Sequence, residues 1–131
     1  MDNSSYFSRI DSVFLPVQDV EKAVNWYTKN LGVELAWKYP SVASFRLGET
    51  PLTLVGYEYP GYEKKPKKDF QFQPVTSPKF NLYATDIEAV HKDLRQKGIE
   101  VTDINNHGGV IDFMFKDLDG NVIAVVWWPE K

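Results

Sequence analysis

Short stretches in which apolar and polar residues alternate recur along the chain, and each of them predicts a β-strand. The first half holds four such stretches, at 10–17, 33–39, 43–47 and 52–57. The second half holds four more, at 79–85, 99–104, 110–116 and 121–128. Two other stretches, at 20–31 and 86–97, place apolar residues every three or four positions and predict amphipathic helices.

End signals flank both predicted helices. Asp19 and Asp86 stand where an N-cap carboxylate accepts a backbone N–H. Gly32 and Gly98 follow the last turns, where a left-handed residue commonly closes a helix. The sequence therefore predicts a strand, a helix and three strands, occurring twice.

The two halves also resemble each other in sequence. The stretch 17–24 aligns with 84–91 over the junction between strand and helix, and 31–34 aligns with 97–100 after the helix. An internal repeat of this kind constrains the whole fold. We expect an α+β protein with a single domain over 1–131, built from two βαβββ modules at about 8–57 and 79–128.

A linker at 58–78 joins the predicted modules and is long for a connection without secondary structure. It can be a solvated loop kept soluble by its four lysines, or a lid over a binding cleft. Nucleic-acid binding is disfavoured, because four lysines flanked by Glu63 and Asp69 supply little positive charge. The residues that would touch a ligand in the lid interpretation are Tyr59, Tyr62, Phe70 and Phe72.

Combining the strands gives the predicted sheets one apolar and one mixed face. The apolar positions, which should pack on the helices, include Leu15, Phe45, Leu54, Phe113 and Ile123. The mixed face carries rings, hydroxyls, an amide, a thioether and charges, a combination typical of a ligand cleft. The alternatives to a ligand cleft are that water covers this face or that a dimer partner packs on it.

Composition limits the chemistry. Hydrophobic residues make up 43% and charged residues 25% of the 131 residues, as in globular domains. The absence of cysteine excludes disulfides and thiolate metal sites, and two histidines are too few for a His-rich zinc site. A net charge of -3 argues against binding to nucleic acid or an anionic membrane. Neither a membrane span nor a signal peptide is recognisable, so we expect a cytoplasmic protein.

Three stretches carry a resemblance to a known family: 17–27 followed by Asn30-Leu31-Gly32, then 85–89, then 113–121 with its Asp-Leu-Asp-Gly-Asn turn. Through these three stretches the chain resembles the vicinal oxygen chelate (VOC) superfamily. This superfamily includes glyoxalase I, bleomycin- and fosfomycin-resistance proteins and extradiol dioxygenases. The resemblance implies a glyoxalase-like incomplete barrel of two modules around a central cleft, and a homodimer. It also implies a divalent metal held by His, Gln or Glu side chains.

The four places where the resemblance puts metal ligands hold other residues: Ser12, Thr53, Lys79 and Ala124. Alanine has no donor atom, and a lysine ammonium repels a dication. The sequence therefore predicts no metal and no cofactor. Without these ligands, glyoxalase, dioxygenase or fosfomycin-transferase chemistry cannot be inferred directly from the resemblance.

Charged candidates remain on the mixed face. Arg46 and Lys79 can hold a carboxylate or phosphate, or either can simply ion-pair with Asp112. His107 and Asp112 can form a general base and its orienting partner, although a lone loop histidine is more often a surface residue. His91, Trp26 and Tyr27 are interpreted as helix-face packing residues.

The favoured hypothesis is a metal-independent VOC-fold protein that binds a small organic or drug-like molecule, as bleomycin-resistance proteins do. No catalytic residue is assigned, and neither nucleic acid nor membrane is expected as a partner. One alternative is a lyase, isomerase or hydrolase that uses His107 and Asp112 or an atypical metal. Another is a regulatory module whose mixed face is a dimer interface. The predicted ligand contacts are Phe14, Ser44, Arg46, Thr53, Lys79, Asn81, Tyr83, Asp112 and Met114.

Overall fold

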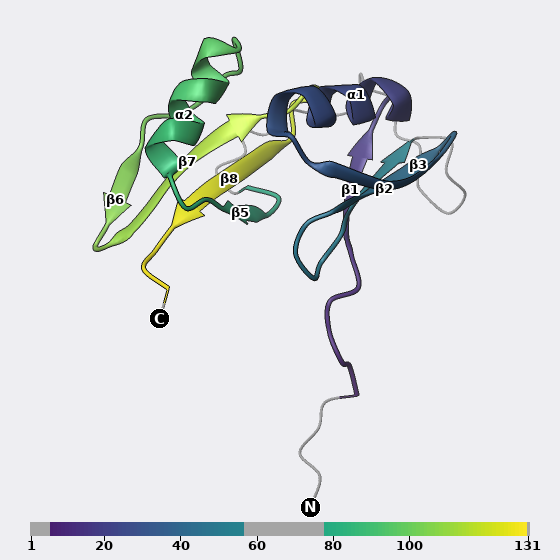
Figure 1. The fold of residues 1–131 in the computed structure, drawn as a ribbon, viewed down its shortest axis with the longest axis horizontal. Coiled ribbons are helices and arrows are strands. Elements are labelled where there is room, and N and C mark those ends of the chain that lie inside the picture. Colours follow the sequence, from purple (N-terminus) through teal and green to yellow (C-terminus); the bar gives the residue numbers. More distant parts are fainter. Residues whose placement is uncertain (1–5, 57–77, 131) are drawn as a thin grey trace, which may run out of the picture. The chain divides into compact units, whose positions relative to one another are not determined.

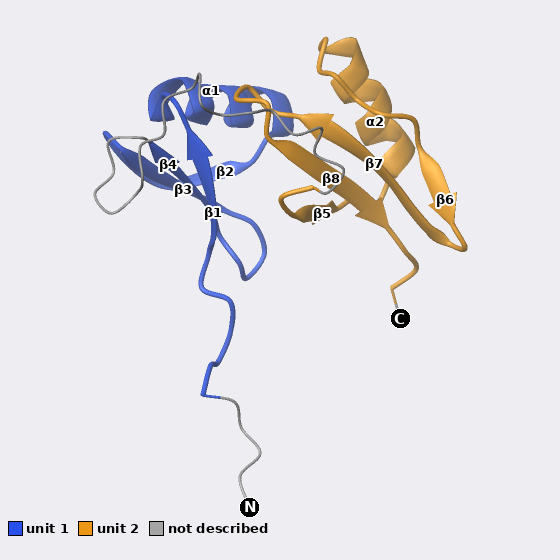
Figure 2. Ribbon diagram, turned by 180° about the vertical axis from the view of Figure 1, so that it is seen from behind, with its two compact units in different colours: residues 1–66 blue, residues 67–131 orange. Residues whose placement is uncertain are grey.

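Residues 6–56 and 78–130 are described by the computed structural model of this chain. The chain divides into two compact units, residues 1–66 and 67–131, each with its own helix and sheet (Figure 2). The predicted linker at 58–78 lies outside the described residues apart from Pro78.

Unit 1 contains one helix and a mixed sheet of four strands (Figure 1). Its elements are β1 (Val13–Val17), α1 (Val20–Leu31), β2 (Glu34–Tyr39), β3 (Val42–Arg46) and β4 (Leu52–Gly56). The strand order is β1-β4-β3-β2. The first strand pairs in parallel with the last, and the other pairs are antiparallel.

Unit 2 repeats this arrangement. Its elements are β5 (Asn81–Tyr83), α2 (Ile87–Gln96), β6 (Asn105–His107), β7 (Val110–Lys116) and β8 (Val122–Trp127). The strand order β5-β8-β7-β6 matches that of unit 1, again with the first and last strands parallel. The predicted α+β fold of two βαβββ modules is confirmed, and the described strands form two open sheets with no closed barrel.

Strand register relates the two units residue by residue. Phe14 lies opposite Thr53 in unit 1, and Asn81 lies opposite Ala124 in unit 2. The alignment of 17–24 with 84–91, extended back by three residues, makes Phe14 equivalent to Asn81. The first strands of the two modules therefore hold equivalent places beside the last strands of their sheets.

The helix ends follow the predicted signals. The Asp19 carboxylate accepts the Lys22 N–H at 3.1 Å, and Asp86 accepts the Ala89 N–H at 3.1 Å. Gly32 closes α1 with φ 67°, a left-handed conformation that an L side chain would strain. Both aspartates satisfy helix donors that would otherwise lack a partner.

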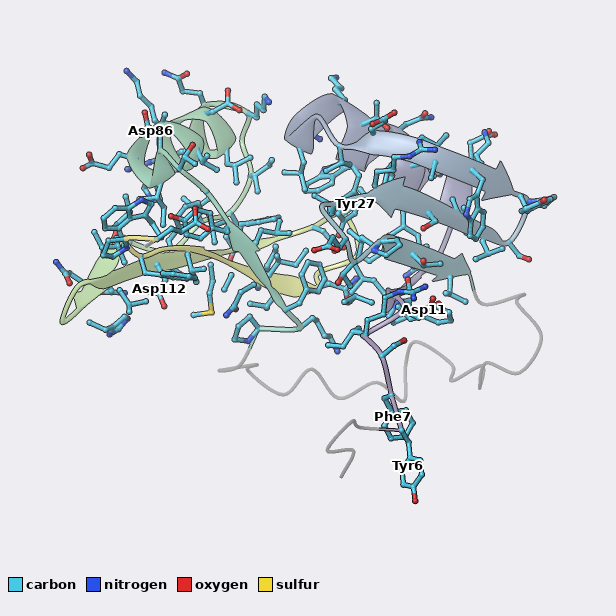
Figure 3. All side chains as sticks on the ribbon, turned by 60° about the horizontal axis from the view of Figure 1, so that its bottom comes forward. Tyr6, Phe7, Asp11, Tyr27, Asp86 and Asp112 are labelled. Atoms are coloured by element: carbon cyan, nitrogen blue, oxygen red, sulfur yellow. The ribbon has the colours of Figure 1, made fainter. Side chains whose placement is uncertain are left out.

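Each helix covers the apolar face of its own sheet. In unit 1, Tyr27 of α1 is fully buried and stacks on Phe45 of β3 with ring centroids 5.8 Å apart (Figure 3). In unit 2, Leu94 of α2 is buried, as are Phe113 and Phe115 of β7. Burying a side chain of this size contributes about 2–3 kcal/mol, so these residues anchor the two cores.

One predicted strand is wrong in extent. The stretch predicted at 99–104 forms only an isolated bridge between Val101 and Phe115, and a short strand β6 follows at Asn105–His107. Thr102 explains the interruption. Its N–H donates to the Met114 carbonyl, but its own carbonyl accepts a hydrogen bond from the His91 side chain and not from the backbone of β7. The pairing with β7 is therefore interrupted.

Neither of the two helices in the described part of the chain is long and apolar enough to cross a membrane.

Candidate ligand-binding faces

The mixed face of unit 1 carries a row of four residues, one from each strand. The register aligns Phe14, Thr53, Ser44 and Trp37 across β1, β4, β3 and β2. The two inner residues are buried, whereas the outer rings are 48% (Phe14) and 44% (Trp37) exposed. Two accessible aromatic side chains thus flank a polar floor.

The polar floor is a chain of hydroxyl groups. Ser12 Oγ donates to the Pro51 carbonyl oxygen at 3.1 Å. Since a hydroxyl carries one hydrogen, Thr53 then donates to Ser12 (2.6 Å) and Ser44 donates to Thr53 (3.1 Å). All three hydroxyl hydrogens are donated within this chain of hydroxyl groups and to the Pro51 carbonyl. Only oxygen lone pairs therefore remain to interact with a ligand.

These residues do not fit the metal that the resemblance implies. Ser12 and Thr53, two of the four expected ligand places, do meet in space, but as neutral hydroxyls bonded to each other. In unit 2, Lys79 and Ala124 supply a positive charge and a methyl group. Among the residues described, no three His, Asp or Glu side chains gather closely enough to hold a metal ion.

Arg46 stands at the end of β3 and pairs within its own unit. Its Nη1 lies 3.4 Å from Glu34 Oε2 on β2, and both side chains are largely exposed. An exposed pair of this kind holds its partners weakly, so the guanidinium stays accessible to another anion.

The mixed face of unit 2 is built from two adjacent rows. One row aligns Tyr83, Val126, Asp112 and Asn105 across the four strands. The next row aligns Asn81, Ala124 and Met114. Figure 3 shows Asp112 projecting from β7 on the side away from α2. The predicted contacts of the second module therefore share one sheet face.

Tyr83 is held at the edge of this face. Its hydroxyl donates to the Trp128 carbonyl oxygen at 2.7 Å, and the two rings meet edge to face with centroids 5.6 Å apart. Desolvation is the main reason that the pKa of Tyr83 is raised above 10.0; the negative charge of Glu130 adds to the shift, and the hydrogen bond to Trp128 opposes it. Tyr83 therefore stays a neutral donor over the physiological range.

His107 and Asp112 form a pair on the hairpin of β6 and β7. His107 Nε2 lies 3.0 Å from Asp112 Oδ1, so the carboxylate accepts its hydrogen and leaves Nδ1 as the basic nitrogen. Gly108 and Gly109 form the two-residue turn with φ 70° and 108°. Asp112 is thus paired with His107 of its own unit. Lys79 of the same unit, one of the two partners that the sequence suggested, forms no ion pair with it among the described residues.

Three other candidates are packing residues, as predicted. His91 meets the buried Phe113 edge to face, with ring centroids 4.8 Å apart. Tyr27 is fully buried, and Trp26 contacts its ring edge to face with centroids 5.1 Å apart.

The sequence-based site omits two rings on the mixed face of unit 1. Trp37 is 44% exposed and Tyr39 is 64% exposed, and their ring centroids lie 5.7 Å apart on β2. The register of β2 shifts between Leu35 and Trp37, which breaks simple alternation and hides the face on which Trp37 lies. The sequence does contain one signal for them: two large aromatic residues, Trp37 and Tyr39, stand two positions apart on one predicted strand and therefore share a face.

The fold and the mixed sheet faces define a duplicated βαβββ protein. The family model of the Glyoxalase/Bleomycin resistance protein/Dioxygenase superfamily matches residues 9–125. The chain belongs to this superfamily. No curated protein matches its sequence.

Solved structures with this fold come from several bacteria. Lactoylglutathione lyase from Agrobacterium tumefaciens is similar with a TM-score of 0.72 and 18% identity, over 94% of this chain and 96% of that chain. TnmS3, an antibiotic binding protein from Streptomyces sp. CB03234, reaches a TM-score of 0.72 at 23% identity, over 96% and 100%. A superfamily member from Alicyclobacillus acidocaldarius reaches 0.68 at 17% identity, over 93% and 92%. At these identities the likeness concerns the fold.

Proposed function

We propose that this protein binds a small organic molecule without the aid of a metal ion, and that the ligand combines aromatic or apolar surface with a polar or anionic group. The observation that carries the proposal is the row in unit 1, where the exposed Phe14 and Trp37 flank the hydroxyls of Ser44 and Thr53. Large rings are poor choices for open solvent and good platforms for a flat ligand.

The donor set supports binding over metal-assisted turnover. Ser12 and Thr53 are neutral hydroxyls hydrogen-bonded to each other, not carboxylates or imidazoles, and Lys79 would repel a dication. The superfamily fold occurs both in a lactoylglutathione lyase and in an antibiotic binding protein. Of these two functions, the residues of this chain fit binding better than metal-assisted catalysis.

We assign the nine predicted contacts to three kinds of role. Phe14, Tyr83 and Met114 supply apolar surface, and Ser44 and Thr53 form the floor beneath the ligand in unit 1. Charge and hydrogen bonds come from Arg46, Lys79, Asn81 and Asp112. To these we add Trp37 as the second ring of unit 1.

The test is calorimetric titration of the full chain with a panel of planar aromatic compounds, in parallel with quenching of tryptophan emission. We expect saturable binding by at least one compound. Trp37→Ala should weaken that binding by about tenfold or more, because buried aromatic anchors dominate affinity. Tyr6→Ala is the matched control: Tyr6 is fully exposed and lies outside every helix and strand of the described chain.

A panel without a single hit would refute the proposal. So would a Trp37→Ala variant that binds every compound as tightly as the parent chain. Trp37→Phe separates the two readouts, since it keeps a ring for binding but removes the emission of that residue.

We further propose, from the superfamily resemblance, that the protein is a homodimer located in the cytoplasm. Light scattering on the purified chain gives the mass in solution, and a monomer at micromolar concentration would contradict the first part. Cell fractionation tests the second part.

A second function is favoured by the 3.0 Å contact between His107 and Asp112. With its Nε2–H held by the carboxylate, the ring offers Nδ1 as a general base for a lyase, isomerase or hydrolase. Hydrolysis of an activated ester would reveal this activity. Loss of saturable turnover in both His107→Ala and Asp112→Asn would support it, and equal rates in all three proteins would exclude a role for the pair.

A further inference from the structure

Tyr83 and Asp112 stand on either side of Val126 at one end of the unit 2 sheet. The register pairs Val126 of β8 with Tyr83 of β5 and, across the other edge of β8, with Asp112 of β7. Paired residues point to the same face, and adjacent strands lie about 4.8 Å apart, so the backbones of Tyr83 and Asp112 are about 10 Å apart. A ring and a carboxylate therefore border the short side chain of Val126, with room for one small ligand group between them.

Trp128 extends the aromatic surface beside Tyr83. The two rings meet edge to face with centroids 5.6 Å apart, and both are more than a third exposed. The hydrogen bond from the Tyr83 hydroxyl to the Trp128 carbonyl fixes the pair. Because the faces of indole and phenol rings carry negative charge density, such a pair attracts an organic cation.

Two carboxylates make this end of the sheet negative. Asp112 Oδ1 accepts the Nε2–H of His107, and a neutral imidazole leaves the charge of the carboxylate uncompensated. The Asp112 side chain is 33% exposed, and among the described residues only His107 bonds it, so Oδ2 remains for a ligand. The charge of Glu130 also acts here, since it raises the pKa of Tyr83.

Two lysines of the same face lie at its other end. Lys79 and Lys116 flank Val122, which is four residues along β8 from Val126. Four strand residues span about 13 Å, which exceeds the Debye length of about 8 Å at physiological ionic strength. The positive charges are therefore largely screened from the end that holds the rings and carboxylates.

We infer that the end of the unit 2 sheet around Val126 binds an organic ammonium ion that carries an aryl group. The ammonium lies between the Tyr83 ring and Asp112 Oδ2, to which it donates a hydrogen bond, and the aryl group packs against Trp128. All of these contacts come from unit 2. The inference rests on the proposed binding function and names the class of ligand that this unit takes.

The tryptophans give a separate signal for each unit. Protein labelled with nitrogen-15 is titrated with 2-phenylethylamine at about pH 8, where an imidazole is neutral, and the indole N–H signals are followed by NMR. The signals of Trp128 in unit 2 and Trp37 in unit 1 are assigned by their loss in Trp128→Phe and Trp37→Phe. We expect the Trp128 signal to shift saturably in the millimolar range.

Charge is tested first with ligands of the same skeleton. The neutral 2-phenylethanol should bind several-fold more weakly than the amine, because it lacks the attraction to the rings and to Asp112. The anion phenylacetate should leave the Trp128 signal unmoved. This comparison uses the parent chain, so it does not depend on the folding of any variant.

Variants then separate the groups of the site. Asp112→Asn keeps the shape of the side chain and should weaken amine binding by about fivefold, with a smaller effect on the alcohol. Glu88→Gln is the matched control: it removes the same charge from α2, on the side of the sheet away from Asp112 (Figure 3), and should bind normally. Tyr83→Leu should weaken amine binding by about threefold.

His107→Ala distinguishes cation binding from a role of His107 as a general base. This variant keeps the Asp112 carboxylate and should bind the amine at least as tightly as the parent chain. Loss of amine binding in His107→Ala would contradict the inference.

Equal affinity for the amine and the alcohol would overturn the inference, as would full amine binding by Asp112→Asn or an unmoved Trp128 signal. The two tryptophan signals distinguish this failure from failure of the proposed function. If a compound of the aromatic panel shifts Trp37 while the amine leaves Trp128 unmoved, the binding function stands and the ammonium site is refuted.

Discussion

His91 and Thr102 join the second helix to the segment that precedes β6. The carbonyl oxygen of Thr102 accepts the Nε2–H of His91 at 2.8 Å, which fixes the imidazole tautomer. The same ring packs edge-on against the buried Phe113. One histidine of this chain is thus a structural residue, whereas the other, His107, lies on an exposed hairpin.

This difference predicts that replacing the two histidines will affect stability unequally. His91→Ala should lower the free energy of unfolding by about 1–2 kcal/mol, because it removes a hydrogen bond and an aromatic contact. His107→Ala should change the free energy of unfolding by less than about 0.5 kcal/mol. Urea denaturation of the three proteins makes the comparison, and two histidine variants of equal stability would contradict it.

Thr53 is the central member of the hydroxyl chain in unit 1. Thr53→Val keeps the shape of the side chain but leaves Ser44 without its acceptor and Ser12 without its donor. We expect a loss of about 1–3 kcal/mol in the free energy of unfolding.

The conservative control is Thr53→Ser, which retains the hydroxyl and should cost less than Thr53→Val. A double-mutant cycle with Ser12→Ala should also show coupling, since the two hydroxyls bond each other at 2.6 Å. Strictly additive effects would mean that the chain does not act as a unit.

Metal removal should be without consequence. The four places where the resemblance puts metal ligands hold hydroxyls, a lysine and a methyl group, so EDTA should leave the thermal unfolding midpoint and ligand binding unchanged. Elemental analysis of the purified protein is the direct measurement. One bound transition metal per chain would refute the metal-independent proposal.

Tyr83 should make stability fall in alkaline solution. Its pKa is raised in the folded protein, first by desolvation and then by the charge of Glu130. The folded state therefore keeps the phenol proton that the unfolded chain loses near pH 10, and stability decreases as the pH rises through and beyond that value.

Thermal unfolding between pH 8 and pH 11 tests this sign. Tyr83→Phe should remove part of the alkaline decrease, and Glu130→Gln should reduce the shift of the Tyr83 pKa. Absorbance at 295 nm follows the phenolate itself. A Tyr83 component that ionises at or below pH 10 would contradict the prediction.

Much of the fold was predictable because local and long-range signals agree. Asp19 and Asp86 cap their helices as predicted, and the strand predicted at 110–116 is β7 at Val110–Lys116. The turn after it was also predictable: Asp117 is buried and accepts the N–H groups of Asp119 and Asn121 at 2.8 and 2.9 Å. Such bonds span a few residues, so the sequence pattern contains them.

The site was less predictable because its contacts depend on register. The pairing of Arg46 with Glu34 follows from which residues of β2 and β3 lie opposite each other, and a register shift near Ala36 changes that alignment. Asp112 likewise meets His107 because the glycine turn sets the hairpin. Side-chain chemistry identified these residues as candidates but could not select their partners.

The parallel pairing of the first and last strands in each unit also has a consequence for folding. Val17 pairs with Gly56, and β5 pairs with β8, so these contacts close nearly a whole module of chain. Closing a loop of that length costs entropy before the contacts form. The adjacent antiparallel strands should therefore assemble early, and β1 and β5 should dock last and exchange their amide hydrogens first.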